Sequence, residues 1–185
     1  MKTTQYASEI VQELSQSIRL ISDNESEKLI NSITESNKIF VAGAGRSGFM
    51  GKSFVMRMMH MGIDAYVVGE TVTANLEEND LLIIGSGSGE TKTLVSIAEK
   101  AKNFRGTVAV VTTAPESTIG KLADIVVHLP GATKNHTENN NQTIQPMGSL
   151  FEQTMMLFYD ALILKFMNKK GLDSQTMYGK HANLE

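Results

Sequence analysis

A chain of 185 residues with 41% hydrophobic and 20% charged residues has the length and composition of one soluble globular domain with a sizeable core. Its formal net charge of −3, without any basic cluster, argues against nucleic-acid binding. It has no cysteine, which excludes disulfides, thiolate catalysis and cysteine-bound metals, and without a signal-peptide core or a membrane-length apolar run it is expected to be cytoplasmic and not membrane-bound.

Two helices are expected at the start of the chain. Ile10, Leu14, Ile18 and Ile21 recur at helical spacing among polar residues, which predicts a long amphipathic first helix. A second helix is expected over about 25–36, with its apolar residues facing inward.

From residue 38 onward, short apolar runs alternate with helical patterns. The expected elements are strand 38–42, helix 47–61, strand 65–68, strand 81–84, helix 91–103, strand 107–111, helix 117–123 and strand 125–129. This alternation predicts an α/β fold, a three-layer αβα sandwich around a five-stranded parallel sheet. The expected strand order is the flavodoxin-like 2-1-3-4-5, in a single domain over 1–185 with its core at about 29–170.

Two later segments have unusual compositions. Residues 131–145 include three consecutive asparagines, 139–141, which predicts an exposed loop long enough to be functional. The helix expected over 148–168 is apolar around most of its circumference, and a subunit interface is the natural explanation. A second apolar cluster either joins that interface or packs in the core; it consists of Met56, Met58, Met59 and Met61.

The segment GSGSGET at residues 85–91 is the most informative part of the chain, because it joins a buried-strand pattern to a helix. Glycines allow close approach of a ligand, and a helix N-terminus offers free N–H groups. Ser86, Ser88 and Thr91 add hydroxyl donors, so the loop suits a phosphate monoester. The alternative is a plain connection with capping hydroxyls, but a cap needs one hydroxyl and not three.

A second glycine loop, GAGRSG at residues 43–48, fits the dinucleotide fingerprint, and Glu70 lies where a ribose-binding acid could sit. The hydroxyl of Ser47 and the redundancy of two glycine loops count against a nicotinamide cofactor. In the expected strand order both loops flank one crevice, which favours a sugar phosphate. The residues expected to bind it are Gly45, Arg46, Ser47, Gly48, Ser86, Gly87, Ser88, Gly89, Glu90 and Thr91.

Together the two loops resemble the sugar isomerase (SIS) domain family over about 29–170. Residues 145–153 and the ending 181–185 resemble more closely the 6-phospho-3-hexuloisomerase family. That resemblance implies an intramolecular oxidoreductase that interconverts D-arabino-hex-3-ulose 6-phosphate and fructose 6-phosphate in the ribulose monophosphate pathway of formaldehyde fixation. It also implies a homotetramer that uses neither a metal nor another cofactor.

Glu152 is the candidate base. The isomerisation moves a proton between neighbouring carbons through an enediol, and one carboxylate above both carbons can do this. The resemblance places the proton acceptor at Glu152, in the first turn of the expected apolar helix. The residues alone leave other roles open, namely a favourable first-turn acid or a capping box with Ser149. Glu90 is the rival carboxylate, although orienting the loop or capping a helix suits it better.

His181 is the second catalytic candidate, because the tail 181–185 resembles the ending of the family. It could close a pocket, in its own or a neighbouring subunit, and shuttle a proton between the sugar oxygens. A solvated tail is the alternative. His60 is expected to be structural, whereas His128 and His136 remain open, and no pair of residues has convincing metal-ligand spacing.

Two other functions stay open besides the isomerase. One is a non-catalytic phosphosugar sensor, since SIS modules also serve as effector domains. The other is a Rossmann-type NAD enzyme.

Overall fold

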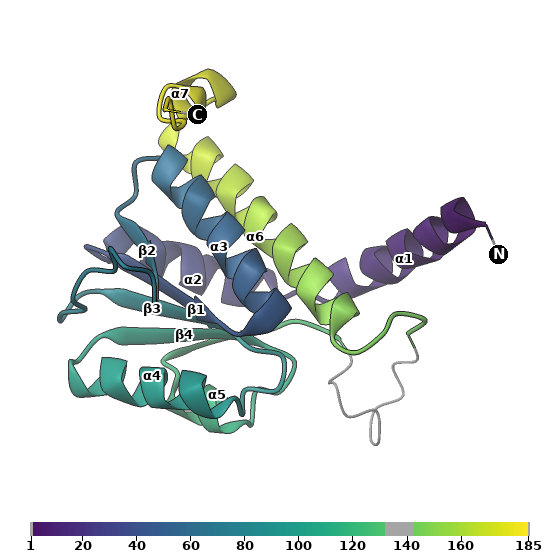
Figure 1. Cartoon of the computed structure of the whole chain (residues 1–185), viewed down its shortest axis with the longest axis horizontal. Helices are drawn as coiled ribbons and strands as arrows, with labels where there is room; N and C mark the ends of the chain where they lie inside the picture. The colour runs from purple at the N-terminus through teal and green to yellow at the C-terminus, as the bar shows by residue number, and fades with distance from the viewer. Residues whose placement is uncertain (1, 132–142, 185) are drawn as a thin grey trace.

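Five parallel strands form one sheet in the order β2-β1-β3-β4-β5, which confirms the predicted α/β fold and strand order. The computed structural model describes residues 2–131 and 143–184 (Figure 1). The strands are β1 (Ile39–Gly43), β2 (Ala65–Val67), β3 (Leu81–Gly85), β4 (Thr107–Thr112) and β5 (Ile125–His128). His136 and Asn139–Asn141, which the sequence singles out, lie outside the described residues.

Helices cover both faces of the sheet, because successive strand residues point to opposite sides. Ile39 and Val41 face one core, against α2 (Asp23–Glu35), α3 (Gly45–His60) and α6 (Ser149–Lys170). Phe40 and Ala42 face the other core, under α4 (Lys92–Asn103) and α5 (Thr118–Leu122). All five residues of β3 are buried, as expected for a central strand of a parallel sheet.

Two helices lie outside these layers. The first, α1 (Thr3–Ile18), projects away from the body as an arm (Figure 1). The last, α7 (Ser174–Tyr178), is one that the sequence analysis did not predict. Asp173 caps α7, because its Oδ1 accepts the N–H of Thr176 at 2.7 Å and the hydroxyl of Thr176 at 2.7 Å.

The long helix α6 is buried on one side and exposed on the other within this chain. Met156 and Leu157 are partly exposed, and Leu164 is 66% exposed. The methionines of α3 divide in the same way, since Met58 is in the core whereas Met56 and Met59 are exposed. The interface that the sequence predicts for these residues stays a prediction.

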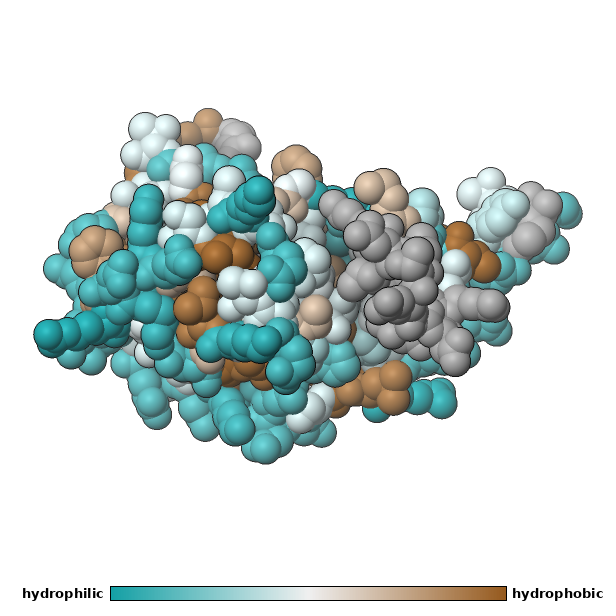
Figure 2. Space-filling model, turned by 90° about the horizontal axis from the view of Figure 1, so that it is seen from below, coloured by the Kyte–Doolittle hydropathy of each residue, from teal (hydrophilic) through white to brown (hydrophobic). Residues whose placement is uncertain are grey.

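Exposed large apolar side chains are unevenly distributed over the helices. On the helices that cover the sheet they lie on α3 and α6, namely Phe49, Met56, Met59, Met156, Leu157 and Leu164. The side of the molecule seen in Figure 2, where α4 and α5 lie, is mostly hydrophilic with small separate apolar areas. No helix in the described part of the chain has both the length and the hydropathy needed to cross a membrane.

Candidate active site

The two glycine loops begin side by side at the carboxyl edge of the sheet. β1 pairs with β3 in parallel, and Gly43 and Gly85, the last residues of the two strands, are register partners. The loops that follow these strands therefore flank one crevice, as the predicted strand order requires. This is the switch point of the sheet, where ligands of such folds bind.

Close backbone packing explains glycines in both loops. A Cβ on Gly48 would lie 2.7 Å from the carbonyl oxygen of Gly43, so β1 and the first turn of α3 can touch only without a side chain there. Gly89 has a φ of +61°, and its Cβ would meet the hydroxyl of Ser117. These two positions allow the loops to adopt their turns.

A cavity of about 260 Å³ lies between the loops, and three helices begin at its wall. The residues that line it are Ala44, Gly45, Ser47, Gly85, Ser86, Gly87, Ser88, Thr91, Leu94, Gly148, Phe151 and Glu152. The N-cap residues of α3, α4 and α6 are Ala44, Thr91 and Gly148, and none of them makes a side-chain capping hydrogen bond. The free backbone N–H groups at the starts of α3 and α4 thus lie at one cavity, which suits a multiply charged anion.

The hydroxyl groups of the second loop do more than cap a helix. Ser86 Oγ accepts the N–H of Gly89 at 3.2 Å, and Ser88 Oγ accepts the N–H of Glu90 at 3.3 Å. Both serines thereby shape the loop while their own O–H groups remain available as donors. Thr91 occupies the N-cap of α4 without capping it, so the capping alternative does not account for its hydroxyl.

Glu90 points away from this cavity and toward α5. Its carboxylate accepts the N–H of Thr118 at 2.7 Å and the hydroxyl of Thr118 at 2.8 Å. Both hydrogen bonds lower the pKa of Glu90, and the bond from the backbone of Thr118 has the larger effect. Glu90 therefore ties the loop at residues 85–91 to α5, and its place does not favour the role of a base.

Glu152 lies at the cavity wall in an ion pair. Its side chain is nearly buried, and Arg46 Nη1 donates to Glu152 Oε2 at 3.0 Å. The same guanidinium nitrogen donates to Ser149 Oγ at 2.8 Å. The capping-box alternative is wrong, because Gly148 and not Ser149 is the N-cap of α6. The carboxylate thus lies beside the cavity with a fixed orientation.

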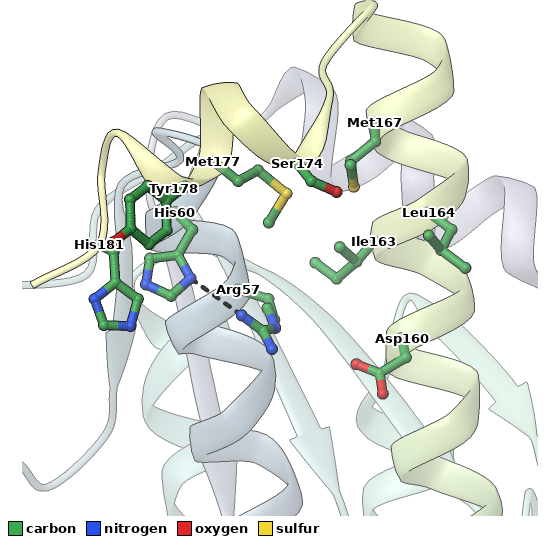
Figure 3. Close-up of a pocket in the computed structure, with 10 residues that line it drawn as sticks. All are labelled: Arg57, His60, Asp160, Ile163, Leu164, Met167, Ser174, Met177, Tyr178 and His181. Atoms are coloured by element: carbon green, nitrogen blue, oxygen red, sulfur yellow. Dashed lines mark hydrogen bonds between the residues drawn. The ribbon is translucent and has the colours of Figure 1, made fainter.

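His181 lies at the opposite end of α3 from this cavity. Its ring stacks on His60 at a centroid distance of 5.3 Å. Both residues line a second cavity of about 410 Å³ between α3, α6 and α7 (Figure 3). Since α3 has 16 residues and is about 24 Å long, the structure does not bring His181 to Glu152 of the same chain.

The remaining histidine and acidic candidates lie away from the cavity. His60 is buried, as a structural role requires, while the side chain of His128 is exposed. Glu70 forms an ion pair with Lys52 at the surface, so the ribose-binding role of the NAD alternative finds no support. In residues 2–131 and 143–184 no three histidine, aspartate or glutamate side chains gather as a metal site would need.

Some features of the site are not marked by any local sequence pattern. Arg46, expected to bind substrate, is also the charge partner of Glu152, a contact across 106 positions that no local pattern reveals. Phe151 and Gly148 line the cavity and were not predicted. The expected strand order together with the expected start of the helix near 148 was the signal that could have placed them. Arg46, Gly48, Gly89 and Glu90 do not line the cavity.

Comparisons with known proteins agree with this geometry. The model of the SIS domain family matches residues 32–165. The 3-hexulose-6-phosphate isomerase of Bacillus subtilis is 58% identical over 185 residues, covering all of both chains. The 3-hexulose-6-phosphate isomerase of Methylomonas aminofaciens is 34% identical over 97% of this chain and 98% of its own.

A solved structure from Methanococcus jannaschii, whose description infers a function as 3-hexulose-6-phosphate isomerase, is also similar. It is 32% identical with a TM-score of 0.84, and the match covers 98% of this chain and 99% of that chain.

Proposed function

The chain belongs to the SIS domain family, and we propose that it is a 3-hexulose-6-phosphate isomerase that interconverts D-arabino-hex-3-ulose 6-phosphate and fructose 6-phosphate. The observation that carries this function is a cavity suited to a phosphate group with the Glu152 carboxylate at its wall. We place the reaction in the cytoplasm, within the ribulose monophosphate pathway, and assign it no metal or cofactor.

The phosphate group of the sugar binds between the two glycine loops. The backbone N–H groups at the starts of α3 and α4 and the hydroxyls of Ser47, Ser86, Ser88 and Thr91 supply its donors. The carbon chain of the sugar then extends toward Glu152 on the other wall. Binding energy from the phosphate positions the reacting carbons.

Glu152 transfers the proton. In the direction of fructose 6-phosphate formation, its carboxylate takes the proton from C2, and the electrons of that C–H bond form the C2=C3 double bond of an enediol. The C3 carbonyl oxygen gains a proton and the C2 hydroxyl loses one. Glu152 then returns its proton to C3, so the reaction is balanced without another reactant.

Arg46 has two roles in this mechanism. Its hydrogen bond to Glu152 orients the carboxylate before substrate binds. Its cationic guanidinium is bound to Glu152 and half exposed, so it can also donate to the sugar oxygens on which negative charge develops, and such a donor stabilises an enediolate.

His181 serves the active site of a neighbouring subunit in the proposed assembly, a homo-oligomer and in our proposal a tetramer. α3 and α6 run side by side from the cavity end to the tail end of the chain (Figure 1). Pairing two copies through these exposed apolar helices in opposite directions would bring the tail of one copy to Glu152 of the other. Residues at a two-fold interface meet reciprocally, so two complete sites would result.

Ligand protection and turnover together test the function. Fructose 6-phosphate should stabilise the protein against heat, whereas fructose and NAD should not. A coupled assay should then show conversion of the hex-3-ulose phosphate. Protection by NAD alone would contradict the proposal in favour of a dinucleotide enzyme, and protection by the sugar phosphate without turnover would favour a sensor.

A further inference from the structure

Glu13 of α1 gathers three hydrogen bonds from one short segment near the active site. Its carboxylate accepts the hydroxyl of Thr143 at 2.7 Å, the N–H of Ile144 at 2.8 Å and the side-chain amide of Gln145 at 2.9 Å. All three partners donate to the two carboxylate oxygens here, a role that an ionised carboxylate fills completely. A carboxamide of the same shape has only one acceptor oxygen, so it could stay in this contact only if the Thr143 hydroxyl or the Gln145 amide turned to accept instead.

The bonds belong to an ordered contact and not to a solvated surface. Gln145 is only 5% exposed, and Glu13 itself is partly buried. Burial raises the pKa of Glu13, but the hydrogen bonds from Thr143, Gln145 and Ile144 outweigh it and hold the pKa below its ordinary value. The carboxylate is therefore ionised at neutral pH and holds all three donors.

The segment held by Glu13 leads directly into the helix that carries the catalytic carboxylate. Three residues separate Gln145 from Ser149, the first residue of α6. Within them, the carbonyl oxygen of Pro146 accepts the N–H of Ser149 at 3.2 Å. The turn also contains Met147 with a φ of +56°, a conformation that side chains other than glycine rarely adopt. Such a turn persists only where its surroundings hold it.

We propose that Glu13 is a positioning residue for the isomerisation: by holding residues 143–145 it fixes the first turn of α6 and thereby the Glu152 carboxylate. This inference rests on the proposed function, because it assigns Glu13 to the proton-transfer half of that site. The phosphate half is built on β1 and β3, which Glu13 does not touch through these hydrogen bonds. Glu13 should therefore affect turnover and not phosphate affinity.

Glu13→Gln tests the proposal, because it keeps the size of the side chain but replaces one of its two acceptor oxygens by an NH2 donor, which then faces either Ile144 or the pair Thr143 and Gln145. We expect kcat to fall about tenfold to a hundredfold, the effect of small misplacement of a reacting group, with KM changed less than about twofold. Glu9→Gln is the matched control, since Glu9 lies one turn earlier on α1 and no described hydrogen bond joins it to residues 143–145. Wild-type kcat in Glu13→Gln, or an equal loss in Glu9→Gln, would overturn the proposal.

Exchanging the residues at positions 13 and 145 distinguishes a loss of positioning from a general disruption of the fold. In the double variant Glu13→Gln with Gln145→Glu, the amide and the carboxylate change places, so a donor again faces an acceptor. We expect this variant to recover a substantial part of the lost kcat, whereas Gln145→Glu alone should be impaired because it sets two carboxylates together. No recovery would contradict the proposal. If Glu13→Gln does not fold, Thr143→Val removes one donor more gently, and unchanged kcat there would count against it.

Hydrogen exchange tests the positioning of the first turn of α6 without relying on the proposed activity. In Glu13→Gln the amide of Glu152, which bonds to the carbonyl of Gly148 at 3.0 Å, should exchange faster than in wild type. The amides of residues 85–91 should be unchanged. A wild-type protein without isomerase activity would refute the proposed function but leave this arm informative. Unchanged exchange at residues 149–152, or a change of oligomeric state in Glu13→Gln but not in Glu9→Gln, would refute the positioning role.

Discussion

The Glu152 side chain is nearly buried and forms an ion pair with one cation, Arg46. A nearly buried carboxylate without a partner is costly, and the ion pair with Arg46 offsets part of that cost at the cavity wall. Arg46 itself is about half exposed, so an arriving substrate can reach it. The ion pair fixes the carboxylate in one orientation, and its value lies in that orientation more than in stability.

Glu152→Gln should separate catalysis from binding. The amide keeps the size of the side chain but cannot take up a proton, so kcat should fall about 10²–10⁴-fold. Protection by fructose 6-phosphate in a thermal shift assay should remain. Glu99→Gln, on the exposed side of α4, is the control and should keep wild-type turnover. A Glu152→Gln protein with most of its activity would transfer the role of the base to another group.

His60 should make stability depend on pH. Burial, then the neighbouring charges of His181 and Arg57, lower the pKa of His60 below its ordinary 6.5. The unfolded chain therefore binds the proton more readily, so the stabilisation is complete above pH 6.5 and is lost as the pH falls toward the folded pKa. His60 alone can change the free energy of unfolding by at most about 1.4 kcal/mol for each pH unit.

Urea unfolding between pH 7.5 and 5.5 checks this effect. His60→Gln removes the titration and keeps an acceptor for Arg57, which donates to the His60 ring at 3.4 Å in the structure. Its stability should depend less on pH than that of wild type. His128→Gln, at an exposed position, should keep the wild-type dependence. If the free energy of unfolding depends on pH equally in wild type and His60→Gln, groups other than His60 cause the loss of stability at low pH.

At the scale of elements, the strands and most helices could be predicted because their patterns are physical consequences of burial. A strand such as β3, covered on both faces, requires a continuous apolar run, and residues 81–84 provide one. The helix α7 has only five residues, four of which are polar or exposed, so it leaves no apolar periodicity to detect. It exists because Asp173 caps it and the chain can pack against the end of α3.

The candidate site was predictable where it depends on local backbone and unpredictable where it depends on packing. The two glycine loops are local features, and the strand order places them together. The Arg46–Glu152 pair joins the starts of α3 and α6, and the distance between these starts follows from helix packing alone. His181 was assigned by resemblance to the family, and the fold of one chain places it with His60 instead.

The proposed binding of phosphate by the loop at residues 85–91 can be tested at Thr91. Thr91→Ala removes a hydroxyl that lines the cavity without capping α4, so helix stability should be unaffected. Affinity for fructose 6-phosphate should fall by roughly 1–3 kcal/mol, the value of a hydrogen bond to a charged group, as measured by titration calorimetry. Thr93→Ala, two residues further along the chain at an exposed position of α4, should bind as wild type. Unchanged affinity in Thr91→Ala would indicate that backbone groups alone hold the phosphate.

At the scale of the whole molecule, the helices on one side of the sheet, α3 and α6, expose large apolar side chains. The exposed apolar side chains of α3 and α6 lie on the side of the sheet opposite to the hydrophilic side of α4 and α5 (Figure 2). The arm α1 adds Tyr6, Val11 and Ile18, which are also exposed. If these side chains are buried between subunits, assembly takes place through α3 and α6.

Complementation between subunits tests whether the tail of one copy completes the site of another. One inactive variant carries Glu152→Gln, and a second lacks residues 181–185. In a mixed pair, the truncated subunit supplies Glu152 and its partner supplies the tail, so one site regains both parts. Random pairing at equal amounts should restore about one quarter of the sites after the two proteins are unfolded together and refolded.

Each variant refolded alone is the control and should stay inactive. If the tail acted only within its own chain, mixing would restore nothing, and full activity of the truncated protein alone would show that the tail has no part in catalysis.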